Sequence, residues 1–154
     1  GHRSILADPR RERMRDWINV RVQEREWFRP FAPMVAEERA SQYFDLQAPS
    51  PFMQFAVPVR SSVMPLLAAV THVDGSARLQ TVGPSDDPVL RALLAGFEVR
   101  TGVPVLLNAS LRDRHEPLVE TPQEAVATFR HLPLHGLAMP PYLVMKRHEP
   151  GLPA

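Results

Sequence analysis

The stretch TGVPVLLNAS, residues Thr101 to Ser110, decides the fold. Gly102 can end a helix, and Val103 to Leu107 is an apolar run of strand length. Asn108 and Ser110 follow where this strand is expected to end. Small polar residues just past the carboxyl end of a buried strand are a common way for an α/β sheet to build a site. The stretch therefore predicts a core strand with candidate site residues at its end.

Helix starts are marked at three places, where an N-cap residue is followed directly by proline. These pairs are Asp8-Pro9, Asp87-Pro88 and Thr121-Pro122. They predict helices over about 9–22, 88–101 and 122–129, and Glu124 adds a capping box to the third.

The segments between these helices read as strands and short turns. An extended segment is expected over 28–35, with Phe28 and Phe31 against the core, followed by a short helix over 37–44. Further strands are expected over 52–59, with Pro58 indicating an edge position, and over 142–146. Asp74-Gly75 predicts a hairpin turn within a strand–turn–strand over 69–82. Strands that alternate with helices predict an α/β or α+β domain.

Composition limits the class of protein. A chain of 154 residues with 44% hydrophobic and 23% charged residues is expected to form one soluble domain, here 1–147 with a flexible tail at 148–154. A net charge of +1 gives no reason to expect nucleic-acid binding, and no apolar run is long enough to span a bilayer. The absence of cysteine excludes disulfides and fits a reducing cytoplasm, where we expect the protein to be located.

The basic residues are almost all arginine. Of the 18 lysines and arginines only Lys146 is a lysine. A high-GC genome would produce this bias without a functional cause. Any anion site in this chain must still be built from guanidinium groups and backbone N–H groups.

Several common kinds of site are excluded by their motifs. His72 and Asp74 are too few for a metal site, and Pro133 breaks the helix that a ligand pair of His131 and His135 would require. There is no GxSxG, P-loop or GxGxxG motif. The polar candidates that remain are Arg29, Arg78, Asn108 and Ser110. Taken alone, each fits a surface salt bridge or a turn better than a site.

Four motifs in a fixed order resemble one family. They are GHRSILADPR (1–10), REWFRPFAP (25–33), VTHVDGSAR (70–78) and TGVPVLLNAS (101–110). Together they resemble the C-terminal domain of the NodU/CmcH-type O-carbamoyltransferases. The resemblance implies a YrdC-like fold, a twisted mixed β-sheet with helices.

The resemblance also implies an activity and partners. This domain would bind ATP as cosubstrate together with carbamoyl phosphate and form carbamoyl adenylate. An N-terminal actin/sugar-kinase-like domain would carry the metal and transfer the carbamoyl group to a hydroxyl of a small-molecule acceptor in natural-product biosynthesis. No metal is expected in the C-terminal domain itself.

Site residues carry over from the motifs one by one. Arg29, Arg78 and Ser110 match residues that hold the phosphates and the carbamoyl adenylate, and these are the expected catalytic residues. Asn108 would hold the loop or a carbamoyl oxygen, and Arg3 is a further binding candidate.

One site position departs from the family. The family usually has lysine where this chain has Gln23, so a neutral amide replaces a mobile positive charge. Two hypotheses follow. The chain is either an adenylate-forming part of a carbamoyltransferase or a catalytically degenerate nucleotide-binding or structural module of the same fold.

Overall fold

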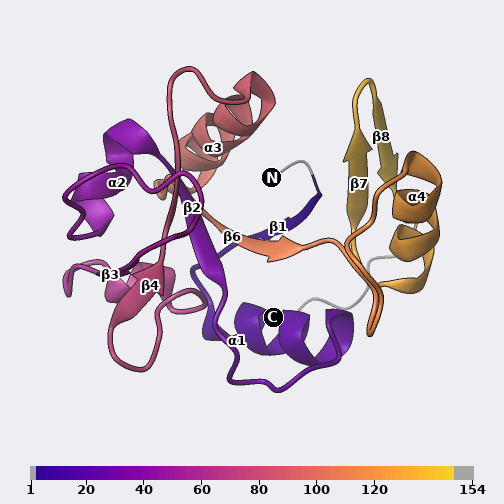
Figure 1. The fold of residues 1–154 in the computed structure, drawn as a ribbon, viewed down its shortest axis with the longest axis horizontal. Helices are drawn as coiled ribbons and strands as arrows, with labels where there is room; N and C mark the ends of the chain where they lie inside the picture. Colours follow the sequence, from indigo (N-terminus) through magenta and orange to yellow (C-terminus); the bar gives the residue numbers. More distant parts are fainter. Residues whose placement is uncertain (1–2, 148–154) are drawn as a thin grey trace. The chain divides into compact units, whose positions relative to one another are not determined.

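The computed structural model describes residues 3–147 and shows a mixed α/β chain (Figure 1). Its helices are α1 (Glu12–Trp17), the π-helical turn η1 (Ile18–Val22), α2 (Glu37–Tyr43), the 3-10 helix η2 (Met64–Leu67), α3 (Pro88–Thr101) and α4 (Pro122–His131). Its strands are β1 (Ser4–Ala7), β2 (Ala32–Ala36), β3 (Ala56–Pro58), β4 (Ser76–Arg78), β5 (Gln80–Val82), β6 (Val105–Ser110), β7 (Gly136–Met139) and β8 (Tyr142–Met145). The tail expected at 148–154 lies outside the described residues.

The described chain divides into two compact units. Unit 1 comprises 3–5, 16–29 and 110–147, and unit 2 comprises 6–15 and 30–109. Each unit is described by itself below.

The main sheet has four strands in the order β1-β6-β2-β5. Strand β2 pairs antiparallel with β6, with Ala32 opposite Asn108, and parallel with β5, with Met34 opposite Gln80. This mixed sheet confirms the predicted α/β class. Strand β6 runs through to Ser110, so Asn108 and Ser110 lie within the strand rather than beyond it as expected.

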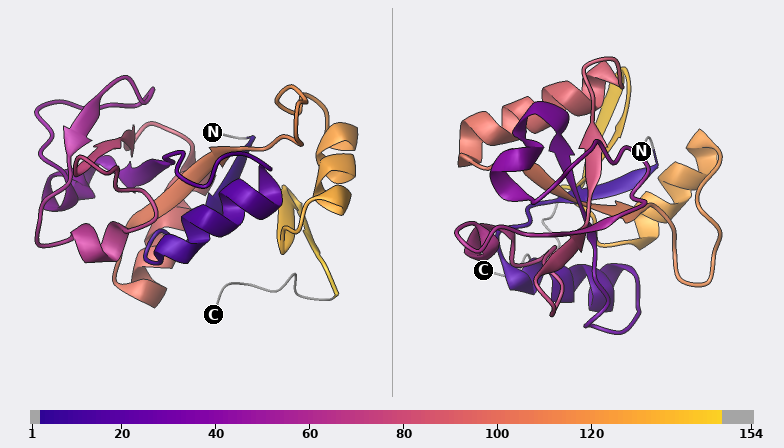
Figure 2. Two further views of the ribbon diagram at one scale, coloured as in Figure 1. Left: turned by 90° about the horizontal axis from the view of Figure 1, so that it is seen from below. Right: turned by 60° about the vertical axis from the view of Figure 1, so that its left-hand side comes forward.

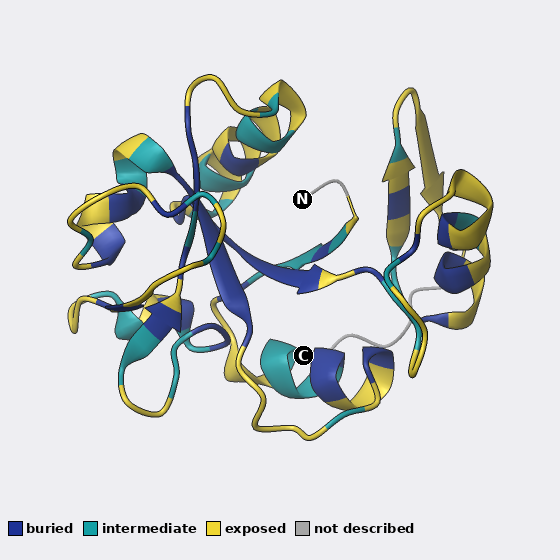
Figure 3. Cartoon of the chain, in the orientation of Figure 1, coloured by how far each residue is buried: buried dark blue, intermediate teal, exposed yellow. Residues whose placement is uncertain are grey.

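The core of unit 2 lies against β2. All five residues of β2 are buried, as a strand with both faces covered requires (Figure 3). Helices α2 and α3 contact this strand (Figure 2). Residues from β2, β5, α3 and β6 form one apolar cluster: Met34, Ala36, Val82, Leu94 and Leu106.

Two of the predicted helix starts are confirmed. The Asp87 carboxylate accepts hydrogen bonds from the N–H groups of Val89 and Leu90 at 2.7 and 3.0 Å, and α3 ends at Gly102, whose φ is 74°. The Thr121 hydroxyl accepts from the Glu124 N–H at 3.2 Å at the start of α4.

The first helix begins later than predicted, at Glu12 rather than Pro9. The Asp8 carboxylate accepts hydrogen bonds from the Arg10 N–H at 3.0 Å and from the Arg10 guanidinium at 2.6 Å. The Pro9 carbonyl accepts from the Ala69 N–H at 2.9 Å instead of from a helical N–H. Asp8 therefore closes a local turn, an alternative to helix that aspartate side chains commonly offer.

The prediction of a hairpin over 69–82 is wrong, although the predicted turn forms. Gly75 has a φ of 79°, and its N–H donates to the His72 carbonyl at 2.9 Å. Strand β4 pairs with β3 instead of with the residues before the turn, and β5 pairs with β2. A turn signal fixes the local bend but does not choose the partner strand.

Two further expectations are corrected. The strand predicted over 52–59 is confined to β3, and Phe52 and Phe55 are exposed. Phe31 is buried as expected, but Phe28 is 60% exposed. Arg29 N–H donates to the Glu26 carbonyl at 3.2 Å, so this segment makes a turn before β2 rather than running extended.

The hairpin of β7 and β8 contacts α4 within unit 1. Leu137 is buried and pairs with Val144, whereas all four residues of β8 are exposed (Figure 3). Just after β8, the Lys146 ammonium donates to the Leu132 carbonyl and lies 5.0 Å from the centre of the Phe129 ring. Among the described residues, no helix combines the length and apolarity needed to cross a membrane.

Candidate anion-binding site

The six residues predicted for the site fall in both units. Arg3, Gln23, Arg29 and Ser110 belong to unit 1, and Arg78 and Asn108 belong to unit 2. Their arrangement is therefore described within each unit.

Gln23 and the end of β6 meet in unit 1. The Gln23 side chain is only 8% exposed, and its amide nitrogen donates to the Ser110 carbonyl at 3.0 Å. The next N–H, that of Leu111, donates to the Arg3 carbonyl at 2.9 Å. The Arg3 guanidinium donates to the Val119 carbonyl at 3.2 Å. The structure thus brings three of the predicted residues together through backbone groups.

Arg29 lies on a segment whose backbone is held by a residue that the sequence did not single out. The Asn19 amide nitrogen donates to the carbonyls of Trp27 and Arg29 at 2.8 and 2.9 Å. The Arg29 side chain is half exposed, and its guanidinium is 3.6 Å from the Glu26 carboxylate. An exposed ion pair at this distance contributes little, so a phosphate can readily replace Glu26 as the partner.

A second arginine near this segment is already paired. Arg114 lies 2.9 Å from the Glu24 carboxylate and donates to the His115 ring nitrogen Nε2 at 2.9 Å. Glu24 and His115 both have positive φ values, 44° and 60°. Arg114, in the loop after β6, is therefore already paired with Glu24.

In unit 2, Asn108 is buried and donates to the Gln80 side-chain oxygen at 2.6 Å. Arg78 ends β4, opposite Ala56 of β3, and is exposed. Gln80 is a second residue that sequence reasoning missed. Its position, two residues after the motif arginine Arg78, was the available signal.

His72 is held in the turn before β4. Its Nδ1 is 3.2 Å from the Ser76 hydroxyl, which donates to the Asp74 carboxylate at 2.7 Å. Its Nε2 is buried and has no hydrogen-bond partner among the described residues. Burial lowers the pKa of His72 below its ordinary value, and the positive charge of Arg78 acts in the same direction against the attraction of Asp74.

This lowered pKa predicts a dependence of stability on pH. Below the ordinary histidine pKa of about 6.5 the unfolded chain binds the proton more readily than the folded chain, so stability falls as the pH falls. We expect His72→Gln to reduce the loss of the urea midpoint between pH 7.5 and 5.5. The measurement is urea denaturation of both proteins at the two pH values. An equal loss in the variant would show that His72 is not the group responsible.

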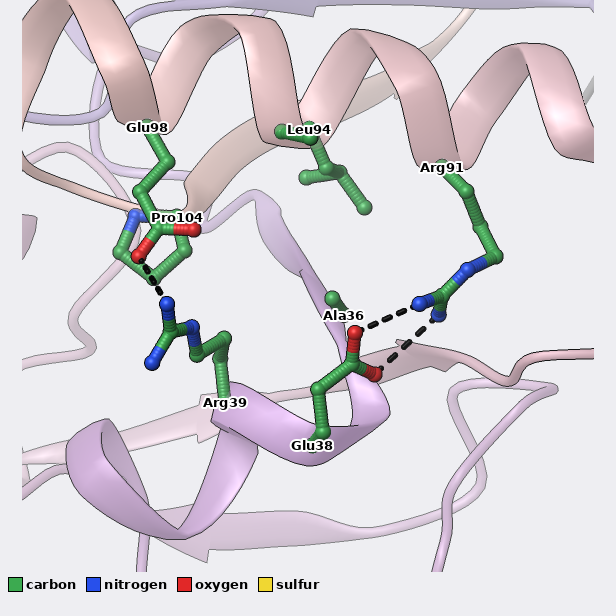
Figure 4. A pocket seen from close by; sticks show the side chains of 8 residues that line it. Ala36, Glu38, Arg39, Arg91, Leu94, Glu98 and Pro104 are labelled. Atoms are coloured by element: carbon green, nitrogen blue, oxygen red, sulfur yellow. Dashed lines mark hydrogen bonds and ion pairs between the residues drawn. The ribbon is translucent and has the colours of Figure 1, made fainter.

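A small hollow lies between α2 and α3 in unit 2, with Ala36, Leu94 and Pro104 among its lining residues (Figure 4). Two ion pairs border it. The Glu38 carboxylate is 2.5 Å from Arg91, and the Arg39 guanidinium is 3.0 Å from Glu98. Hydrogen bonding from Arg91 holds the pKa of Glu38 below its usual value. These four charges neutralise one another, which makes the hollow a poor anion site.

The described residues contain no group of three or more histidine or acidic side chains that could hold a metal ion. The mixed sheet and its helices define an α/β domain, and within unit 1 the structure joins Arg3, Gln23 and Ser110 through backbone groups.

A family model described as "Carbamoyltransferase C-terminus" matches residues 1–146. The chain belongs to this family, which confirms the resemblance to the NodU/CmcH-type enzymes.

Curated relatives agree with this assignment. Nodulation protein NolNO of Sinorhizobium fredii is 49% identical over 150 residues, which cover 96% of this chain and 22% of that protein. Nodulation protein NolO of Bradyrhizobium diazoefficiens is 46% identical, covering 96% of this chain and 27% of that protein. Nodulation protein U of the same species is 42% identical over 110 residues, covering 71% and 19%. The chain therefore spans about a quarter or less of the length of these relatives.

Proposed function

We propose that the chain is the part of an O-carbamoyltransferase that binds ATP and carbamoyl phosphate and forms carbamoyl adenylate. The observation that carries this proposal is the match of the carbamoyltransferase C-terminal family over residues 1–146. Unit 1 supports it, because this unit holds Gln23, Arg29 and Ser110 and the Gln23 amide donates to the Ser110 carbonyl.

The chemistry needs positive charge and hydrogen-bond donors around phosphate oxygens. Water first hydrolyses carbamoyl phosphate to carbamate and inorganic phosphate. A carbamate oxygen then attacks the α-phosphorus of ATP, and the bond to pyrophosphate breaks. Arg29 and Arg78 would hold the non-bridging oxygens, the Ser110 hydroxyl would donate to them, and Asn108 would hold a carbamoyl oxygen.

Transfer to the acceptor belongs to another part of the enzyme in this proposal. The relatives are several times longer than the matched region, which supports a partner domain N-terminal to it. That domain would pass the carbamoyl group to a hydroxyl of a small-molecule natural product. A cytoplasmic location is part of the same proposal, since ATP and carbamoyl phosphate are cytoplasmic metabolites.

Gln23 favours a second candidate, a catalytically degenerate module. Its amide is buried and donates to the Ser110 carbonyl, so it offers the phosphates no charge. A lysine at this position could donate to the same carbonyl and keep two further N–H donors for a phosphate.

We expect Gln23→Lys to tighten ATP binding about tenfold, which corresponds to ~1.4 kcal/mol. The measurement is titration calorimetry of the full chain with ATP, in the presence and absence of carbamoyl phosphate. The wild-type chain is expected to bind ATP saturably. Gln47→Lys is the matched control, because Gln47 is exposed in unit 2 and the charge change is the same.

The two candidates differ in the outcome. Saturable wild-type binding that Gln23→Lys tightens and Gln47→Lys does not supports an ATP site with weakened charge, and pyrophosphate release from ATP in the presence of carbamoyl phosphate then separates adenylate formation from nucleotide binding alone. No heat from either the wild type or Gln23→Lys at millimolar ATP supports the structural form of the degenerate module.

A further inference from the structure

Asn19 is fully buried in η1, between Ile18 and Val22, which are also fully buried. The turn is π-helical, with the Gln23 N–H donating to the Ile18 carbonyl at 2.8 Å. Single π-helical turns are rare and often occur at functional sites. A buried amide in such a turn has to find partners for both its donor and its acceptor.

Asn19 finds these partners in the segment that follows. Its amide nitrogen donates to the Trp27 and Arg29 carbonyls, as described above, and its side-chain oxygen accepts from Arg25 Nε at 2.7 Å. Its backbone carbonyl accepts from the Arg25 N–H at 2.8 Å. One residue therefore holds three positions of the segment 25–29.

Side-chain burial does not hold this segment. Trp27 and Phe28 are 58% and 60% exposed, although their rings pack edge-on with centres 5.9 Å apart. The Arg29–Glu26 ion pair is exposed and long. The polar contacts to Asn19 thus attach the backbone on either side of Phe28 to a buried residue.

We propose that Asn19 is a positioning residue for the anion site. It fixes the peptide carbonyls of Trp27 and Arg29 and so sets the direction in which the Arg29 guanidinium leaves the backbone. This inference rests on the proposed function, because it takes Arg29 to contact the phosphates of ATP.

The physical benefit is preorganisation. Fixing the backbone of a flexible residue costs conformational entropy, and a segment fixed during folding does not bear that cost again when the ligand binds. If the segment were loosened, Arg29 would keep its charge, but the two N–H donors of its planar guanidinium would no longer be held in one orientation.

A double-mutant cycle tests the proposal on the full chain. The four proteins are the wild type, Asn19→Ala, Arg29→Ala and the double variant, each titrated with ATP by calorimetry. We expect Asn19→Ala to weaken ATP binding about tenfold in the wild-type background and to have no further effect once Arg29 is alanine. Equal effects in both backgrounds would overturn the proposal, since Asn19 would then act independently of Arg29.

Hydrogen exchange gives a second readout. Asn19→Ala is expected to speed exchange in a peptide covering 24–29, where the Arg25 and Arg29 amides are hydrogen-bonded, but not in one covering α4. Thr128→Ala is the control, because Thr128 is a buried polar residue of α4 in the same unit. It should lower stability without changing ATP affinity. Unchanged exchange in 24–29 would refute the holding role.

Two further outcomes are distinguished by design. Should Asn19→Ala fail to fold, Asn19→Asp keeps the volume and the acceptor for Arg25 but loses both donated hydrogen bonds, and the same results are expected of it. A wild-type chain that binds no ATP overturns the proposed function and this inference together. If the wild type binds ATP and Asn19→Asp binds it equally tightly, the inference alone is overturned.

Discussion

Arg29→Ala is expected to weaken ATP binding by about 10- to 100-fold. Hydrogen bonds to charged groups contribute about 1.5–3 kcal/mol, and each 1.4 kcal/mol is a factor of ten in affinity. To bind a phosphate, the Arg29 guanidinium has to give up its long, exposed ion pair with Glu26. Breaking this pair costs little. Titration calorimetry of the full chain with ATP measures the change.

Arg100→Ala is the matched control, since Arg100 is an exposed arginine in the last turn of α3 and its loss changes the net charge equally. Its ATP affinity should equal that of the wild type. If both variants weaken binding to the same extent, the effect is one of net charge and Arg29 has no special place in the site.

Leu107→Ala is expected to destabilise the fold by about 2–5 kcal/mol, the usual cost of truncating a fully buried leucine. Leu107 is 0% exposed and pairs with Pro33 of β2 in the middle of the mixed sheet. The close packing of such a core leaves a cavity where the side chain was. Urea denaturation gives the free energy of unfolding.

Leu93→Ala provides the comparison, because Leu93 lies on α3 and is 45% exposed. It should cost far less, about 1 kcal/mol or below. Similar losses for the two leucines would mean that burial of Leu107 in β6 contributes no more to stability than the partly exposed Leu93 does.

Local signals in the sequence were reliable where their partners lie close by in the chain. Asp87 and Thr121 cap their helices because the N–H groups they accept from are two or three residues away. The apolar run before Asn108 could also be predicted as a strand, because a strand that is buried on both faces has apolar residues at every position.

Long-range pairing could not be predicted in the same way. The turn at Gly75 forms, but β4 finds its partner in β3, some twenty residues earlier. Likewise, the sequence predicts that Asp8 caps a helix, but the Asp8 carboxylate closes a local turn. The carbonyl of the next residue, Pro9, accepts a hydrogen bond from the Ala69 N–H. These choices depend on contacts between distant residues, which no local pattern encodes.

The candidate site was predictable only in part. The motifs named Gln23 and Ser110, which the fold places in contact, but they could not indicate that Asn19 holds the Arg29 segment. A polar residue beside the apolar positions Ile18 and Val22 was the available signal. It is weak, because most such residues simply border a solvent-exposed face.

The chain's single lysine turns the hairpin of unit 1 into a chemical handle. Lys146 keeps its ammonium on the Leu132 carbonyl and over the Phe129 ring, at the point where β8 ends. An amine-reactive dye has no other lysine to modify. The Lys146 amine has to leave the Leu132 carbonyl before it can react with the dye. The rate of labelling at Lys146 therefore reports how often the ammonium leaves the Leu132 carbonyl and the Phe129 ring.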